Sequence, residues 1–452
     1  MTRRYTTVAV LVGASLTAVA CAPGGGSGGE ESTTSKAASE VETDPAAMGD
    51  ITLTVWDQEV RGGQDKQMKA LNAAFEKKYP NITIKRVSRS FDDLTKTLRL
   101  ALTGDDAPDV VQANNTRSQM GQFVKAKQII NLDPYAEAYG WRDRYPESVQ
   151  SVVSYSPDAK TFGEGSIFGL PQVGEVVGIF YDKKMMEDLG IEQPKTWAQF
   201  EEALATAKEA GETPLVLGNI EKWPAVHVFG ALQGRYTDAE TIRTLGYGRP
   251  GASWTDEGNE QTGATLVDWV DKGYFNEGFN GEGYDAAWQS FSKGDGLFLI
   301  AGSWLQSDLY AAMKDDVGFM LPPVEKEGDT PVTTGGSGLP FAVTSKAENP
   351  DAAAAYIDFI TNDDAMDVLA ENGNMPVVGT AERKAADPLG DEIFAAFGEV
   401  SEKDGLTPYL DWATPTMGDT MGAGLQDMLA GKKDPKAAME TIEADYAEFT
   451  KE

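Results

Sequence analysis

The sequence predicts an α/β fold with two domains, and three observations indicate it. From residue 51 onward, apolar residues recur at period two and then at the helical period, in alternation along the chain. Proline and capping residues stand where these segments change from one period to the other. The part after residue 50 is roughly 400 residues long, which exceeds what one hydrophobic core usually serves. We find no internal repeat at the periods of solenoids or propellers.

The first elements after residue 50 form a predicted β-α-β unit. Residues 51–55 alternate apolar and polar side chains, as a half-buried strand does. A helix follows and ends at Pro80, and a second strand lies around Ile84. Such alternation is typical of a parallel sheet covered by helices. The apolar face of the predicted helix consists of Met68, Leu71, Phe75 and Tyr79.

The same alternation continues to the end of the chain. A helix is predicted near residues 94–102, and another strand begins at residues 108–111. Thr196, with a glutamine three residues later, has the spacing of a capping box at the start of a helix. Asn349 and Asp434 each precede a proline, so we expect each side chain to cap the helix that begins there.

The first fifty residues predict export and lipid attachment. Two arginines precede an apolar run, residues 8–20, that is too short to span a bilayer as a helix. Cys21, the only cysteine, directly follows small residues suited to a signal peptidase. We therefore expect residues 1–20 to be a signal peptide and residues 21–50 a flexible linker, lipid-anchored at Cys21. The paired arginines also permit export by the twin-arginine route.

The composition restricts the partners. The chain carries 71 acidic and 39 basic residues, so its surface should repel nucleic acid and anionic lipid headgroups. No second apolar stretch approaches the ~20 residues of a transmembrane helix, so we expect membrane contact through the lipid alone. His227, the only histidine, is flanked by valines, and we expect it to be packed rather than to bind a metal. We predict no cofactor and no catalytic residues, because no phosphate loop or activated nucleophile is recognisable.

Several short segments, in their order and spacing, resemble a known family. They are Tyr79-Pro80-Asn81-Ile82, residues 104–110, Gly169-Leu170-Pro171 leading to Phe180-Tyr181-Asp182-Lys183, residues 194–197, residues 291–294 leading to Gly302-Ser303-Trp304, and Thr344-Ser345-Lys346 followed by Asn349-Pro350. Together they resemble the extracellular sugar-binding proteins of ABC importers, of the maltose-binding type (extracellular solute-binding protein family 1). The resemblance extends over nearly the whole chain after the linker.

The resemblance implies a two-lobed periplasmic-binding-protein-like fold of type II, with the ligand in a cleft between lobes joined by hinge crossovers. It implies a monomeric carbohydrate receptor, held outside the cytoplasm on the outer face of the cell membrane. The receptor would close around its ligand and deliver it to two permease subunits of an ABC transporter, without catalysis. The expected N-terminal lobe comprises residues 51–173 and 323–374, the C-terminal lobe residues 174–322 and 375–452, and the crossings lie near Glu175, residues 322–338 and residues 374–376.

The aromatic candidates for the site are tryptophans. A pyranose offers C–H groups on its faces and hydroxyls around its rim, so its site requires flat rings together with carboxylates or amides. By resemblance, Trp304 occupies the family's stacking position. Trp56 ends the first strand, where open α/β sheets place ligands, and Trp223 and Trp412 are further candidates. The alternative for each is a place in the core. The abundance of tryptophan favours an oligosaccharide of two or more units.

The polar candidates follow predicted strands or lie near crossings. Glu175 interrupts an apolar run, so its carboxylate must find partners or bear a large desolvation cost. By resemblance it faces the sugar at the first crossing. The other candidates follow the two strands (Asp57, Glu59, Asn114, Asn115 and Arg117) or adjoin the tryptophans (Ser303 and Asp411). A solvated loop is the alternative for several of them.

Two other classes of function stay open. A secreted glycoside hydrolase would also need aromatic platforms and two carboxyl groups ~5 to 9 Å apart, and it would release reducing ends. A carrier of a polyamine or a hard cation would also suit acidic residues. For a polyamine, the carboxylates would lie at the two ends of the cleft with aromatic rings between them.

Overall fold

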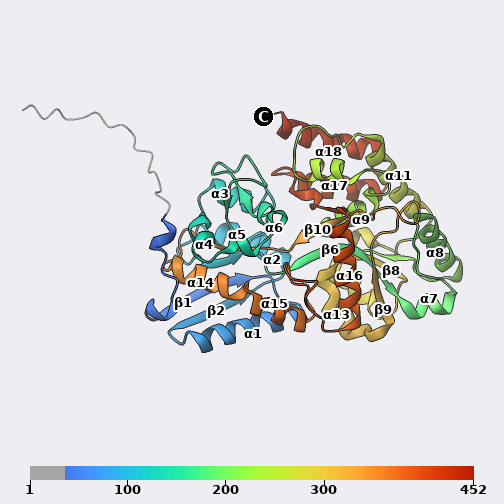
Figure 1. Ribbon diagram of the computed structural model, residues 1–452. Helices are drawn as coiled ribbons and strands as arrows, with labels where there is room; N and C mark the ends of the chain where they lie inside the picture. Colours follow the sequence, from blue (N-terminus) through green and yellow to red (C-terminus); the bar gives the residue numbers. More distant parts are fainter. Residues whose placement is uncertain (1–35, 452) are drawn as a thin grey trace, which may run out of the picture. The chain divides into compact units, whose positions relative to one another are not determined.

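The computed structural model describes residues 36–451 (Figure 1). The predicted signal peptide, Cys21 and the linker up to residue 35 lie outside the described residues. Residues 36–50 contain two short 3-10 helices, Ala38–Glu40 and Pro45–Ala47. Both the Lys36 ammonium and the Glu42 backbone N–H donate to the Asp351 carboxylate. The C-terminal end of the predicted linker is therefore attached to the folded part.

The first sheet has the strand order β11-β3-β1-β2. Its strands are β1 (Ile51–Asp57), β2 (Ile82–Ser88), β3 (Val110–Gln112) and β11 (Phe341–Val343). β1 pairs in parallel with β2 and with β3, whereas β11 is antiparallel to β3. Its helices are α1 (Gly62–Lys78), α2 (Phe91–Ala101), α14 (Pro350–Ile360) and α15 (Asp363–Glu371). The predicted β-α-β unit is present, and α14 and α15 pack on α1 although they come much later in the chain (Figure 1).

The second sheet has the order β12-β10-β6-β8-β7, and β9 also pairs with β6. Every residue of β6 (Gly174–Asp182) is buried, so this strand forms the centre of the domain. The other strands are β7 (Leu215–Val216), β8 (Phe298–Gly302), β9 (Val317–Met320), β10 (Thr333–Ser337) and β12 (Leu406–Thr407). β10, within the range 323–374 expected for the first lobe, pairs with β6 of this second sheet. The passage to the first sheet thus lies between Ser337 and Phe341.

Helices surround both sheets. Those that follow β3 are short: α3 (Met120–Lys125), α4 (Asp133–Ala138), α5 (Trp141–Arg144) and α6 (Glu147–Ser151), with the hairpin strands β4 (Ser154–Tyr155) and β5 (Ser166–Ile167). The second domain has α7 (Lys183–Leu189), α8 (Trp197–Ala210), α9 (Trp223–Gln233), α10 (Ala239–Gly246), α11 (Glu257–Asp271), α12 (Tyr284–Phe291), α13 (Gln306–Met313), α16 (Pro388–Glu402), α17 (Met417–Leu429) and α18 (Pro435–Thr450). The predicted α/β class is confirmed.

Of the three helix starts that were predicted from capping residues, two have the predicted cap. Thr196 and Gln199 form the predicted capping box of α8. Asp434 accepts from the Ala437 backbone N–H at 2.8 Å and caps α18. The expectation for Asn349 was wrong, because its side chain makes no capping bond. Its backbone is turned to φ −129°, ψ 72°, and its carbonyl oxygen accepts from the Ala353 N–H at 3.0 Å.

The three segments expected as crossings lie side by side. The Gly338 N–H donates to the Val173 carbonyl at 2.8 Å, and the Gly174 N–H donates to the Met375 carbonyl at 2.8 Å. Val173 also forms an antiparallel bridge with Pro376. Backbone hydrogen bonds therefore hold the connections between the two sheets together as one narrow junction.

Candidate functional site

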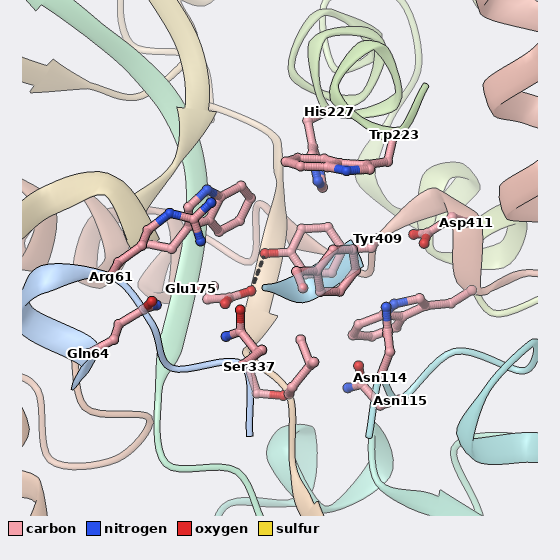
Figure 2. Close-up of a pocket in the computed structure, with 15 residues that line it drawn as sticks. Arg61, Gln64, Asn114, Asn115, Glu175, Trp223, His227, Ser337, Tyr409 and Asp411 are labelled. Carbon is pink, nitrogen blue, oxygen red and sulfur yellow. Dashed lines mark hydrogen bonds between the residues drawn. The ribbon is translucent and has the colours of Figure 1, made fainter. Parts of the chain in front are cut away.

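A pocket opens beside this junction and takes its lining from both domains (Figure 2). The space, including the open solvent at its mouth, is about 690 Å³. The first domain contributes the segments after β1 and β3 and the start of α2, and the second domain contributes α9, the 3-10 helices Ser303–Leu305 and Leu410–Trp412, and the start of β6. The lining residues are Gln58, Arg61, Gln64, Phe91, Asn114, Asn115, Glu175, Trp223, His227, Trp304, Ser337, Leu339, Tyr409, Asp411 and Trp412.

One side of the pocket is a continuous set of rings from the second domain. We call it the aromatic wall: Trp223, His227, Trp304, Tyr409 and Trp412. The His227 ring lies 5.4 Å from Trp223, 5.3 Å from Trp304 and 5.2 Å from Tyr409, between ring centroids. Tyr409 in turn lies 5.2 Å from Trp412. Trp223 and His227 are four residues apart on α9 and so share one helix face. Each ring is fixed by its neighbours before any ligand arrives.

Local structure fixes Trp304 and Trp223 of the aromatic wall. The Trp304 indole N–H donates to the Tyr284 hydroxyl at 2.7 Å. Gly302 allows the Trp304 ring to lie against the chain, because a Cβ there would come within 2.0 Å of that ring. The start of α9 is held by the buried Asn219, whose Oδ1 accepts from the Ala225 backbone N–H at 3.0 Å.

The opposite side is polar and comes from the first domain. We call it the polar wall: Gln58, Arg61, Gln64, Asn114 and Asn115. Gln58 follows β1 directly, and the two asparagines follow β3, so all three stand at the carboxyl ends of neighbouring parallel strands. In Figure 2, Asn114 and Asn115 lie on the side opposite Trp223 and His227. The buried Gln64 Oε1 accepts no hydrogen bond from the described residues. These side chains retain hydrogen-bonding capacity for a ligand.

Two carboxyl groups also line the pocket. The Glu175 Oε2 accepts from the Tyr409 hydroxyl at 2.9 Å (Figure 2). Burial raises the pKa of Glu175 to about 7, although this bond opposes the shift. Burial also raises the pKa of Asp411 to about 6. Burial lowers the pKa of His227 to about 4, so its imidazole is neutral at pH 7.

Most of the predicted site residues meet in this pocket. They are Asn114, Asn115, Glu175, Trp223, Trp304, Asp411 and Trp412. Trp56, Asp57, Glu59, Arg117 and Ser303 do not line it. Asp57 and Glu59 flank the lining residue Gln58, because successive side chains point to different sides of an extended segment.

The residues outside the pocket have partners of their own. Asp57 accepts from the Arg86 guanidinium at 2.6 and 2.9 Å. Trp56 is half-buried, and the Arg89 guanidinium carbon lies 4.5 Å from the centre of its ring. The other three are buried: Glu59 accepts from the Gln112 amide at 2.6 Å, Arg117 donates to the carbonyls of Lys160 and Tyr247 at 3.0 and 3.2 Å, and the Ser303 hydroxyl accepts from the Val176 N–H at 3.2 Å.

Several lining residues were not among the predicted site residues. They are Gln58, Arg61, Gln64, Phe91, His227, Ser337, Leu339 and Tyr409. The spacing of His227, four residues after the candidate Trp223, could have revealed it, because a helix places both on one face. Ser337 lies in the crossing that we expected near residues 322–338. For Phe91 and Leu339 we find no signal in the sequence.

The two domains touch at the mouth of the pocket. The Arg61 guanidinium donates to the Asp285 carboxylate at 3.1 Å. The Gly63 N–H donates to the Ser307 hydroxyl at 2.8 Å, and a Cβ on Gly63 would come within 2.3 Å of the Asn372 carbonyl oxygen. The start of α1 is therefore seated closely against the second domain at α13.

The described part of the chain shows neither a metal-binding cluster nor a membrane-spanning helix. Among residues 36–451 no group of three or more His, Cys, Asp or Glu side chains is placed to hold a metal ion. Within the same residues, no helix combines the length and the apolar character that a membrane crossing requires.

The chain is similar to proteins of known type over most of its length. It is 22% identical over 331 residues to the multiple sugar-binding protein of Streptococcus mutans, covering 72% of this chain and 75% of that protein. It is 23% identical over 286 residues to a maltooligosaccharide ABC transporter solute-binding lipoprotein of Streptococcus pneumoniae serotype 4, covering 62% and 64% of the two chains. Among solved structures it resembles a chitin oligosaccharide binding protein, with a TM-score of 0.75 and 22% identity, covering 89% of this chain and all of that one.

The family comparison agrees with the geometry of the fold. Residues 61–367 match the family described as bacterial extracellular solute-binding protein. This range includes most strands of both sheets and most of the pocket lining. The resemblance stated from the sequence is thereby confirmed, and the chain belongs to the bacterial extracellular solute-binding protein family.

Proposed function

We propose that the protein is a carbohydrate receptor that delivers its ligand to the permease of an ABC transporter. The observation that carries this proposal is the aromatic wall facing the polar wall across one pocket. Rings can stack on the C–H faces of a sugar, while amides, carboxyls and the Arg61 guanidinium hydrogen-bond its rim hydroxyls. The relatives support the same class, because their names give sugars, maltooligosaccharides and chitin oligosaccharides as ligands.

The ligand should contain two or more sugar units. Trp223, Trp304 and Trp412 offer separate indole surfaces in one pocket. A single pyranose stacks on one or two rings, so further rings are useful only to further sugar units.

Binding would work by closure of the two lobes. The narrow junction at Val173, Gly338 and Met375 is the natural hinge, since the chain connects the sheets there. A ligand drives closure only through a higher affinity for the closed form, and contact with both walls supplies that difference. One lobe would comprise residues 51–173 and 323–374, and the other would comprise residues 174–322 and 375–452. β10, although it lies within 323–374, would belong to the second lobe, because it pairs with β6.

The chain would be held at the membrane by a lipid on Cys21. The apolar run and small residues before Cys21 support this, and the Streptococcus pneumoniae relative is named a lipoprotein. Residues 21–35 would then tether the receptor outside the cytoplasm. We expect a monomer that needs no cofactor and performs no catalysis.

Calorimetric titration of the purified protein against mono-, di- and oligosaccharides tests the proposal. Micromolar or tighter binding of a glycan without release of reducing ends is the expected result. Release of reducing ends would instead indicate a glycoside hydrolase, for which Glu175 and Asp411 would be the candidate carboxyl pair. Silence from every glycan, with binding of spermidine or calcium, would contradict the carbohydrate class.

A further inference from the structure

The charged side chains that line the pocket are unbalanced toward acid. They are Arg61, Glu175 and Asp411. The Arg61 guanidinium donates to the Asp285 carboxylate at the mouth, so its charge is already shared. His227 contributes no charge, because burial lowers its pKa to about 4. Among the described lining residues, two carboxyl groups therefore face the pocket, and the Arg61 guanidinium is already paired with Asp285.

Asp411 differs from Glu175 in having no partner for its carboxylate. The Tyr409 hydroxyl donates to Glu175. In the described part of the chain we find no side chain that donates to Asp411, and burial raises its pKa to about 6 with only its own backbone opposing the shift. Figure 2 shows its oxygens directed toward Tyr409 and the interior of the pocket. The side chain is half-buried, and a partly desolvated carboxylate without a cationic partner favours a ligand that brings a positive charge.

The rings beside Asp411 suit a cation. Tyr409 and Trp412 flank it in sequence, line the same pocket and lie 5.2 Å apart at an interplanar angle of 77°. The faces of tyrosine and tryptophan attract ammonium groups electrostatically, and the attraction grows when water is excluded. The same faces accept the C–H surface of a sugar ring. A ligand that carries both an ammonium group and a sugar ring could contact Asp411 and the rings of Tyr409 and Trp412 together.

Acidic side chains also lie beside the pocket lining. Asp92 adjoins the lining residue Phe91 at the start of α2, Glu221 comes two residues before Trp223, and Asp285 on α12 pairs with Arg61. Burial raises the pKa of Asp92, and the carboxylates of Glu221 and Asp285 raise it further, with Lys96 opposing them. An acidic rim around a cleft concentrates cations and increases their rate of entry.

We propose that the ligand is a glycan bearing a protonated amino group, and that the ammonium binds at Asp411 beside the rings of Tyr409 and Trp412. This inference rests on the proposed carbohydrate receptor. It adds a charge requirement to the ligand and assigns that requirement to one side chain. Glu175, with its Tyr409 partner, is left to bind hydroxyls.

The test uses oligosaccharides that differ only at one position of each sugar. Trimers in several linkages are prepared with a hydroxyl, an acetamido or a free amino group at C2, and each is titrated by calorimetry at pH 6.5. We expect the amino form of the bound linkage to bind at least tenfold more tightly than its hydroxyl form. We also expect this advantage to shrink as salt is raised from 0.05 to 0.5 M, because screening weakens the charge interaction.

Variants assign the effect to the residue. Asp411→Asn keeps the size of the side chain and removes its charge, so the amino form should lose most of its advantage while the hydroxyl form changes less than threefold. Asp419→Asn, an exposed acid outside the pocket lining, is the matched control and should leave the advantage intact. Melting curves of both variants show whether they fold. If Asp411→Asn does not fold, Asp411→Ser, which also removes the charge, takes its place with the same expected loss of the advantage.

The other outcomes separate this inference from the function on which it rests. Equal or tighter binding of the hydroxyl or acetamido form would overturn the charge requirement and leave the carbohydrate receptor standing. An amino-form advantage that survives Asp411→Asn would overturn the assignment to Asp411. Binding of spermidine with silence from every glycan would overturn both the inference and the proposed function.

Discussion

The two walls of the pocket differ in chemistry and in how firmly neighbouring side chains hold them in place. In the aromatic wall, each ring contacts another at centroid distances of 5.2 to 6.3 Å, so the rings hold one another in place. In the polar wall, the Gln64 Oε1 accepts no hydrogen bond from any residue that the structure describes. A fixed apolar surface binds without loss of side-chain entropy, whereas polar groups select by their unsatisfied hydrogen bonds. We infer that the second domain supplies most of the affinity and the first domain supplies discrimination.

Loss of an aromatic ring should have the largest effect. Trp304→Ala removes a ring that lies 5.3 Å from His227 and faces the pocket. We expect it to weaken binding of an oligosaccharide by about 2 to 3 kcal/mol, because stacking area and a packed neighbour are lost together. Calorimetric titration measures the change.

A second tryptophan is the control for this prediction. Trp56 was predicted from the sequence to bind ligand, but it lies outside the pocket lining under Arg89. Trp56→Ala should change the affinity by less than about 0.5 kcal/mol. If Trp56→Ala weakens binding as much as Trp304→Ala does, the division of roles between the two walls is incorrect.

The buried Glu59 carboxyl group gives the next largest predicted effect, which is on the stability of the fold. Burial raises the pKa of Glu59 to about 7, and the nearby Asp57 carboxylate adds to the shift, against the Gln112 and Gln58 hydrogen bonds and the Arg86 charge. In the unfolded chain the same carboxyl titrates near pH 4.5. Between these values the unfolded state binds fewer protons, so the free energy of unfolding falls as pH rises from about 4.5 to about 7.

Glu59→Gln should remove this cost. We expect the variant to be more stable than the wild type by about 2 kcal/mol at pH 8 and equal to it or less stable at pH 4, measured by urea unfolding. The exposed Glu371 provides a control, since Glu371→Gln should leave the pH dependence unchanged. A stability difference that is the same at both pH values would show that ionisation of Glu59 is not its cause.

A single polar side chain should matter less than a ring. Gln64 is buried, lines the pocket and has an Oε1 without a partner in the described part of the chain. Gln64→Ala should weaken oligosaccharide binding by about 1 kcal/mol, the usual contribution of one neutral hydrogen bond. Lys66→Ala, two residues further along α1 and exposed, should have no measurable effect. Equal effects of the two variants would place Gln64 outside the ligand contacts.

The sequence predicted the fold well because its signals are local. The alternation of strand and helix, the capping box at Thr196 and the cap at Asp434 each depend on neighbouring residues, and the structure contains all three. Pairing between distant segments left no such signal. Nothing local shows that β10 joins β6, or that residues 36–50 attach to Asp351.

The difference between local and long-range signals also explains which of the predicted site residues line the pocket. Trp304 and Glu175 were found because the family resemblance marks them, and both line the pocket. Asp57 and Glu59 were chosen because they come at the end of the first predicted strand, which is where a ligand would bind. The side chains of Gln58 and Arg61 face the pocket instead, since Asp57 points away from it to Arg86. Sequence position identified a loop that lines the pocket, but it did not identify which side chains of that loop face inward.

The contact between the two domains at Arg61 and Asp285 gives the smallest predicted effect. Arg61 and Asp285 join the domains at 3.1 Å, with side-chain exposures of 17% and 64%. An ion pair this exposed contributes roughly 0.2 to 1 kcal/mol. Asp285→Ala should therefore weaken binding of a neutral oligosaccharide about twofold at low salt, if the pair helps to hold the closed form, and the effect should disappear in 0.5 M salt. Asp268→Ala, which breaks the Lys272 pair on α11, is the matched control and should change the affinity at neither salt concentration. A loss that persists in high salt would mean that Asp285 contacts the ligand itself, and the polar wall would then extend onto the second domain.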